Sequence, residues 1–138
     1  DLYQVHWPDR PAPGFGSNPN VFKVPERPAD ETPIEESLAA LDKLVKAGKV
    51  LHIGLSNEST WGLMKWLEAS EKGVGPRVCS IQNAYSLVNR TFEVNLAEVC
   101  RREEVSLLAY SPLAGGILSG KYLDGKKPAG SRGGSGAP

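Results

Sequence analysis

The chain has 138 residues, of which 40% are hydrophobic and 23% are charged, and its 16 basic and 16 acidic residues cancel. This composition is typical of a soluble globular protein. The balanced charge, without a stripe of Lys and Arg, argues against nucleic acid or an anionic membrane as the main partner. No apolar run approaches the roughly 20 residues that a membrane-spanning helix needs.

The two cysteines, Cys79 and Cys100, lie within apolar patterns and match neither a metal-binding nor a CxxC spacing. We expect both to be buried, reduced thiols, which indicates a reducing compartment and a cytoplasmic protein. No signal peptide opens the chain. Its first residues, which lack Met and already form a predicted strand, are typical of a truncated sequence.

The first predicted elements are a strand at residues 2–6 and a helix at residues 34–47. Between them lies a long irregular segment, residues 7–31, rich in Pro, Gly and Asn. The helix is predicted because four apolar residues recur at helical spacing on one face, Ile34, Leu38, Leu41 and Val45, with acidic residues early and basic residues late. Residues 32–35 (TPIE) have the spacing of a capping box, and Gly48 suits the left-handed residue that ends a helix.

Strands and helices then alternate. Strands are predicted at residues 50–55, 78–82 and 105–110, and helices at residues 60–72 and 92–103. The apolar residues expected to face inward from these two helices are Trp61, Met64, Trp66 and Leu67, and Leu96, Val99 and Cys100. Short apolar strands that alternate with amphipathic helices indicate a parallel sheet with right-handed crossovers.

Polar side chains end each predicted strand. The residues are His6, Ser56 and Asn57, Gln82 and Asn83, and Tyr110 and Ser111. Singly, a histidine at a strand end is often structural and Ser-Asn before a helix is often an N-cap. Because the carboxyl ends of parallel strands form one rim where active sites are built, the four together predict a shared site.

The chemistry of this rim can be narrowed from its residue types. Ser, Asn and Gln suit paired hydrogen bonds to an amide, a tyrosine ring can stack on a flat heterocycle, and His can donate to a carbonyl oxygen. The sequence shows no metal-ligand spacing, no GxSxG elbow, no P-loop and no GxGxxG after a strand. Residues 115–121, with Gly115, Gly116, Gly120 and Lys121, are open to two interpretations, a flexible loop or a phosphate-binding loop.

Four segments resemble the aldo-keto reductases. They are residues 2–9 (LYQVHWPD), 53–57 (IGLSN), 81–90 (IQNAYSLVNR) and 109–122 (AYSPLAGGILSGKY). They occur in the family's order at strand–helix spacing, and the closest branch resembles the Tas-type reductases and the potassium-channel β-subunits. The resemblance covers about residues 1–132.

The resemblance implies a fold and an activity. Aldo-keto reductases are (β/α)₈ TIM barrels, of which this chain would span strands four to seven with the three intervening helices. Residues 1–132 would form this partial barrel domain, and residues 133–138 a disordered tail rich in Gly, Ser and Pro. The family reduces small aldehydes and ketones with NADPH, so NADP(H) is the expected cofactor and a carbonyl compound the expected partner.

The resemblance also assigns roles residue by residue. His6 matches the histidine that orients the carbonyl, Ser56, Asn57 and Gln82 match residues that hold the nicotinamide carboxamide, and Tyr110 matches the aromatic residue that stacks on the nicotinamide ring. Further cofactor contacts are implied for Ser111, Pro112 and Leu113 along the pyrophosphate, and for Lys121 and, with a one-residue shift, Arg132 in the covering loop.

Part of the family's machinery has no match in this chain. The catalytic Asp, Tyr and Lys of the family belong to earlier strands, and the segment that grasps the adenosine 2′-phosphate follows the eighth strand. The chain alone is therefore expected to show little or no turnover. A second hypothesis is a cofactor-binding regulatory subunit like the channel β-subunits. The substrate and the oligomeric state cannot be read from the sequence, and the preference for NADPH over NADH rests on the resemblance alone.

Overall fold

A computed structural model describes residues 1–12, 21, 24, 26 and 30–133 of the chain. Its centre is a sheet of four parallel strands in chain order, β1 (Leu2–Val5), β2 (His52–Ser56), β3 (Val78–Ala84) and β4 (Ser106–Tyr110). Every neighbouring pair is parallel, so the chain crosses over between each strand and the next. Within the described residues the sheet stays open, which confirms the prediction of a partial α/β barrel.

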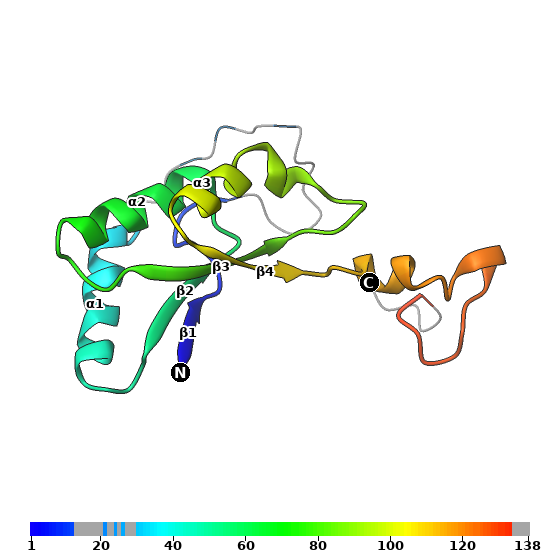
Figure 1. Cartoon of the computed structure of the whole chain (residues 1–138), viewed down its shortest axis with the longest axis horizontal. Coiled ribbons are helices and arrows are strands. Elements are labelled where there is room, and N and C mark those ends of the chain that lie inside the picture. The colour runs from blue at the N-terminus through cyan, green and yellow to red at the C-terminus, as the bar shows by residue number, and fades with distance from the viewer. Residues whose placement is uncertain (13–20, 22–23, 25, 27–29, 134–138) are drawn as a thin grey trace.

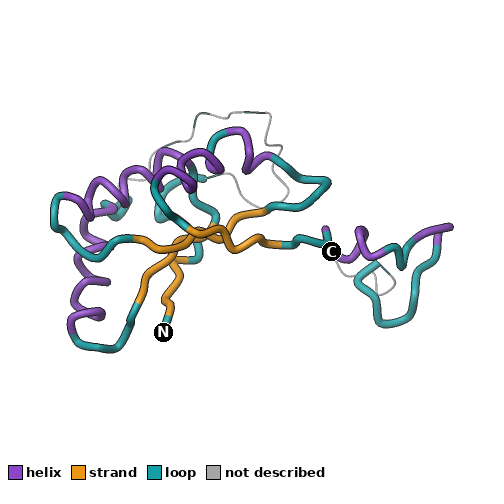
Figure 2. The backbone as a smooth tube through the Cα atoms, viewed as in Figure 1, coloured by secondary structure: helices purple, strands orange, loops and turns teal. Residues whose placement is uncertain are grey.

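Three helices occupy the crossovers and cover one face of the sheet (Figures 1 and 2). They are α1 (Ile34–Lys46), α2 (Thr60–Glu71) and α3 (Leu96–Arg102). The predicted strands and helices are thus all present, with ends that differ by one or two residues for most of them.

The core lies between this helix layer and the sheet. Its fully buried strand residues include Ile53, Leu55, Val78 and Ile81, and its buried helix residues include Leu38, Leu41, Leu63, Trp66, Leu67, Leu96 and Cys100. Each large apolar side chain buried in this way contributes roughly 1.5–3 kcal/mol. Ile34, Val45 and Val99 pack partly buried against the same cluster, as their helical spacing predicts.

The capping box predicted before α1 is wrong. The helix begins at Ile34, its N-cap is Pro33, and no side chain caps it. Thr32 is used elsewhere, because its N–H donates to Asp9 Oδ2 at 3.2 Å. Hydrogen bonds from the side chain and backbone of Thr32 lower the pKa of Asp9. Gly48 does adopt the predicted left-handed conformation, with φ of 68°.

The inner face predicted for α2 is half wrong. Trp66 and Leu67 are buried, but Trp61 is 57% exposed and Met64 41% exposed. Ser59 caps the helix by accepting the Gly62 N–H. From this start the inward positions three and four residues apart are those of Leu63, Trp66 and Leu67, so Trp61 falls outside the stripe.

The helix predicted at residues 92–103 is broken in two. A 3₁₀ turn, Thr91–Val94, precedes α3, and Asn95 between them has non-helical angles, with φ of −139° and ψ of −49°. Phe92 in the first turn packs on Tyr85, with ring centroids 5.7 Å apart. The contact with Tyr85, in the loop after β3, therefore fixes the position of the 3₁₀ turn. Leu96 and Cys100 of α3 are buried in the core.

Three further features bear on the predictions. Cys79 and Cys100 are free thiols, but only Cys100 is buried as predicted, and Cys79 is half-buried. Burial raises the pKa of Cys100. None of the helices in the described part of the chain is long and apolar enough to cross a membrane. Much of the irregular segment 7–31, and residues 134–138 of the predicted tail, lie outside the described residues.

Candidate functional site

The carboxyl ends of all four strands lie side by side, and hydrogen bonds join each to the next. Asn57 Nδ2 donates to His6 O at 2.9 Å, and the Asn57 N–H donates to Gln82 O at 3.0 Å. The Tyr85 N–H donates to Tyr110 O at 3.2 Å. The predicted rim residues His6, Asn57, Gln82 and Tyr110 are therefore on neighbouring exits of one sheet.

Three of the predicted residues also share one face of the sheet. Ser56 pairs with Gln82 in the register, and its hydroxyl donates to Gln82 O at 2.9 Å. Because side chains alternate along a strand, both point away from the face on which Leu55 and Ile81 meet the helices. Tyr110, which pairs with Ala84, falls on the same helix-free face and is 40% exposed.

Two residues at the strand exits have unusual backbone angles. Asn57 follows β2 with φ of 54°, and Ser111 follows β4 with φ of 56°. Left-handed angles cost little for Asn but more for Ser. Such strain gathers at functional sites, where the surrounding structure holds it in place. Both positions belong to the predicted cofactor contacts.

Next to this rim is a buried ion pair that the sequence analysis missed. The Arg10 guanidinium binds both carboxylate oxygens of Glu58, one of them through Nη1 at 3.1 Å. The Glu58 side chain is 2% exposed and that of Arg10 is 14% exposed. Asn83 bonds twice to the Glu58 backbone: its Oδ1 accepts the Glu58 N–H at 3.2 Å, and its Nδ2 donates to Glu58 O at 2.9 Å.

We name these residues, with two from the start of α2, the Glu58 cluster: Arg10, Glu58, Ser59, Trp61 and Asn83. The Ser59 N–H donates to Glu58 Oε1 at 2.6 Å, and Arg10 lies over the Trp61 ring, 5.0 Å from its centroid. A Cβ atom at Gly62 would overlap both Glu58 Oε1 and Arg10 Nη2, so a larger residue there requires the ion pair to shift. The cluster ties the exits of β1, β2 and β3 together.

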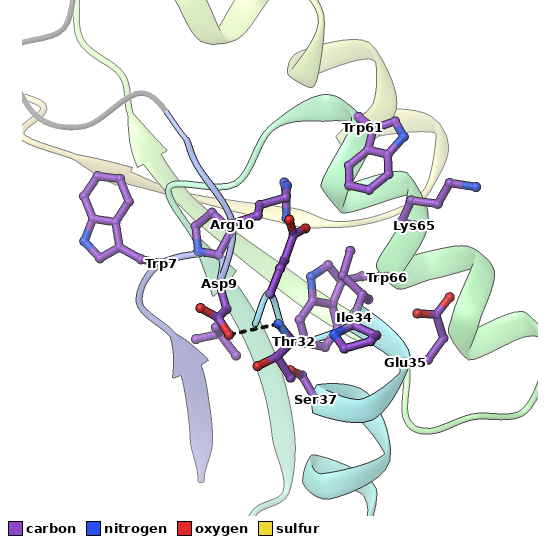
Figure 3. Close-up of a pocket in the computed structure, with 14 residues that line it drawn as sticks. Trp7, Asp9, Arg10, Thr32, Ile34, Glu35, Ser37, Trp61, Lys65 and Trp66 are labelled. Atoms are coloured by element: carbon purple, nitrogen blue, oxygen red, sulfur yellow. Dashed lines mark hydrogen bonds between the residues drawn. The ribbon is translucent and has the colours of Figure 1, made fainter. Parts of the chain in front are cut away.

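A pocket of about 330 Å³ adjoins the Glu58 cluster on the helix side (Figure 3). It lies between the chain after β1, the start of α1 and the first turns of α2. Its lining includes Val5, Trp7, Arg10, Thr32, Trp61 and Trp66. Val5 pairs with Leu55 and so faces the helices, opposite to Ser56 and Gln82. The chemistry predicted at the strand exits does not lie in this pocket.

The remaining predicted residues lie on a segment that leaves the sheet after β4 (Figure 1). We call residues 111–133 the Lys121 excursion. It holds Ser111, Pro112 and Leu113 at its start, and two 3₁₀ turns, Ala114–Ser119 and Leu123–Gly125. Lys121 and Arg132 lie further along it, and both approach the Gly115–Gly116 turn.

In the described part of the chain, no group of three His, Cys, Asp or Glu side chains could hold a metal ion. The polar groups of the rim are amides, hydroxyls and an imidazole. These groups suit hydrogen bonds to a neutral amide better than the binding of a divalent cation.

Comparison with known proteins decides the family. A family model described as "Aldo/keto reductase family" matches residues 1–133. The chain belongs to this family. The family and the TIM-barrel fold that the four motifs implied are therefore confirmed.

Relatives of this chain include the Escherichia coli protein named "Protein tas", 50% identical over 135 residues, which cover 96% of this chain and 37% of that protein. An "Aldo-keto reductase" of Babesia bovis is 41% identical, covering 93% of this chain and 47% of the relative. A crystal structure described as "a putative 2,5-diketo-D-gluconic acid reductase B" superimposes with a TM-score of 0.57 at 26% identity, covering 84% of this chain and 32% of that one. The chain thus spans less than half the length of these relatives.

Family membership does not by itself test the roles of single residues. The structure brings His6, Ser56, Asn57, Gln82 and Tyr110 to adjoining strand exits. The remaining predicted contacts, Ser111, Pro112, Leu113, Lys121 and Arg132, lie on the Lys121 excursion. Their contacts with a cofactor stay predictions.

The Glu58 cluster left only a weak signal in the sequence. Glu58 directly follows the polar exit of β2, a place where a carboxylate is costly to bury. Its partner Arg10 is 48 residues away, beyond the reach of any helical or strand periodicity.

Proposed function

We propose that this protein is an NADPH-dependent aldo-keto reductase that reduces the carbonyl group of a small aldehyde or ketone to an alcohol. Family membership and the reductase names of its relatives support the oxidoreductase class. The observation that carries the proposal is the set of polar and aromatic side chains, Ser56, Gln82 and Tyr110, on the helix-free face of the sheet at the strand exits.

The residues present fit a nicotinamide group. A carboxamide has one acceptor oxygen and two donor hydrogens. The Gln82 amide can donate to that oxygen, and the side-chain oxygens of Ser56 and Asn57 can accept from the hydrogens. The half-exposed ring of Tyr110 offers a flat apolar surface for stacking. When bound, the cofactor supplies the hydride that reduces the carbonyl carbon.

The work of this chain would be to bind and to orient. His6 would donate a hydrogen bond to the carbonyl oxygen, and its own backbone is fixed by the bond from Asn57 Nδ2. Tyr110 would determine which face of the nicotinamide ring meets the substrate. Holding the two reactants in register is worth much of a catalytic barrier, so small displacements of these side chains should be costly.

Steady-state carbonyl reduction tests the proposal in the product of the complete reading frame. Gln82→Ala and Tyr110→Ala should raise KM for NADPH by roughly tenfold or more, because each removes a contact to the cofactor. His6→Ala should lower kcat while leaving the KM for NADPH nearly unchanged. Ser106→Ala is the matched control, since Ser106 lies on the same strand as Tyr110 at its opposite end.

The 138-residue chain separates binding from turnover. We expect it to bind NADPH and to reduce no aldehyde, because the family's general acid has no match in it. Binding by the complete protein without any carbonyl reduction would instead favour the regulatory role of the channel β-subunits. Normal KM values for NADPH in both Gln82→Ala and Tyr110→Ala would contradict the proposed site.

A further inference from the structure

The Tyr122 side chain contacts two other parts of the Lys121 excursion. Its hydroxyl accepts a hydrogen bond from the Gly133 N–H at 3.0 Å, 11 residues further along the chain. The ammonium group of Lys121 lies over the Tyr122 ring. Its Nζ is 5.2 Å from the ring centroid, which is within the usual range of a cation–π contact. Tyr122 therefore contacts both the far end of the excursion and the cation beside it.

The Lys121 side chain in turn lies against Gly116. A Cβ atom there would be 2.7 Å from Lys121 Cε and 2.8 Å from Nζ, and the φ of 95° also favours glycine. On the neighbouring Gly115, a Cβ atom would meet Arg132 Cδ at 3.9 Å. Two basic side chains thus approach the same glycine turn, and one of them is held there by an aromatic ring.

We propose that Tyr122 is a positioning residue, which holds the Lys121 ammonium against the Gly115–Gly116 turn so that a fixed positive charge meets the pyrophosphate of a dinucleotide. This inference rests on the proposed function, because the resemblance implies a cofactor contact for Lys121 and none for Tyr122. Tyr122 acts through Lys121 and takes no part in proton transfer to the substrate.

The physical reason is the conformational freedom of an exposed lysine. A lysine on a surface loop samples many rotamers, and ordering it on a ligand costs part of the binding free energy. The ring of Tyr122 and the bare backbone of Gly116 confine the side chain before any ligand is present. The hydrogen bond from Gly133 confines the ring itself.

The same contacts determine the direction in which the pKa of Tyr122 is shifted. The hydrogen bond from the Gly133 backbone, then Ser131 and the charge of Lys121 lower the pKa of Tyr122. Tyr85 has the opposite environment, because its hydroxyl donates to the Glu93 carboxylate at 2.5 Å, which raises its pKa. The two tyrosines therefore form an internal pair of probe and control.

Calorimetric titration of the full chain with inorganic pyrophosphate, and separately with NADP⁺, tests the proposal. Tyr122→Leu, which removes both ring and hydroxyl, should weaken each affinity by roughly two- to fivefold, as expected for an exposed cation–π contact. Tyr122→Phe, which keeps the ring, should have the smaller effect. In a Lys121→Met background, Tyr122→Leu should have no further effect, because a residue that acts through Lys121 has nothing left to position.

A spectroscopic signature distinguishes positioning from mere folding of the loop. Tyr122 should ionise before Tyr85 as pH rises, seen in ultraviolet absorbance as a step that is absent in Tyr122→Phe. Saturating pyrophosphate brings negative charge beside Lys121 and should raise the pKa of Tyr122, while the later titration of Tyr85 stays in place. A pKa of Tyr122 that does not change when pyrophosphate binds would overturn the inference.

The remaining outcomes separate the two proposals. If Lys121→Met weakens binding and Tyr122→Leu does not, or if Tyr122→Leu has an equal effect with and without Lys121, the positioning role fails and the proposed function stands. If Lys121→Met leaves both affinities unchanged, or pyrophosphate does not bind, the positioning role fails as well. NADP⁺ binding that is lost in Gln82→Ala then shows that the proposed cofactor site survives this failure.

Discussion

The Glu58 cluster and the Lys121 excursion both contain basic side chains, but they hold them in different ways. Glu58 is almost fully buried, and its partners Arg10 and Asn83 come from the exits of two other strands. Lys121 is exposed and leans on the residue next to it, Tyr122.

The Glu58 cluster is a rigid framework, whereas Lys121 is a weakly held cation on the surface. A buried ion pair cannot lose one partner without leaving an uncompensated charge in a medium of low polarity. A lysine on a surface loop is screened by water, so its contact with the Tyr122 ring holds it much less strongly than a buried ion pair would. The buried ion pair suits a fixed geometry for His6 and Asn57. The exposed lysine suits the binding of a charged ligand at the surface.

The sharpest way to break this comparison is to remove Arg10. Arg10→Met leaves the buried Glu58 carboxylate without its cation and is expected to destabilise the chain by about 3–5 kcal/mol. Urea unfolding of the variant and of the parent chain measures the difference.

Arg90→Met is the matched control for this change. It breaks the exposed pair of Arg90 with Glu93, which has the same chemistry at the surface. Its effect should be a small fraction of that of Arg10→Met. Equal effects of the two variants would remove the distinction between framework and excursion.

Gly62→Ala tests the close approach of the ion pair to α2. Helix propensity alone predicts that alanine stabilises this position by about 1 kcal/mol. The new Cβ would overlap Glu58 and Arg10, so we expect a loss of about 1–3 kcal/mol instead. Repeating the change in a Glu58→Ala background, where the carboxylate is gone, should recover most of that loss. A stabilised Gly62→Ala chain would show that the cluster is looser than described.

Asn57 couples the framework to the rim, and two variants divide its contributions. Asn57→Gly removes the bond to His6 O and should cost about 1 kcal/mol. Asn57→Ala keeps a Cβ at the left-handed angle but loses the polar side chain that makes this angle tolerable for Asn, and should cost about 1 kcal/mol more than Asn57→Gly. Glu104→Gly, at another residue with φ of 54°, is the control and should not lower stability. Indistinguishable unfolding curves for Asn57→Gly and Asn57→Ala would argue against backbone strain at this exit.

The smallest effect concerns Glu68 on the outer surface of α2. Hydrogen bonds from Lys65 and Lys72 lower the pKa of Glu68 to about 2. Because the folded-state pKa lies below the ordinary value of 4.5, the stabilisation is present above that value and is lost as pH falls toward 2. Glu68→Gln should therefore lower the melting temperature slightly at pH 7 and not at pH 2. A difference that persists at pH 2 would assign the effect to something other than the charge.

The framework could be predicted from the sequence where local periodicity determines it. Helical spacing identified Leu38, Leu41 and Leu96 as inward residues, and alternating elements implied a parallel sheet with its exits on one edge. The shared edge in turn brought His6 and Gln82, far apart in the chain, into one predicted site. These inferences need only the geometry of helices and strands.

Other features could not be predicted because distant contacts decide them. Thr32 donates a hydrogen bond to Asp9 instead of capping its own helix. Trp61 faces outward, where Arg10 lies over its ring. The break at Asn95 depends on the loop that Phe92 meets. In each case a partner many residues away overrides a local preference that was correctly read.

The most direct test of a nicotinamide site is an NMR titration of the ¹⁵N-labelled chain with NADP⁺. The account predicts saturable shifts in the side-chain amides of Asn57 and Gln82, together with an Overhauser contact between the Tyr110 ring and nicotinamide protons. Shifts confined to the amino ends of the strands, around residues 49–51 and 75–77, or no saturable shifts at all, would contradict it.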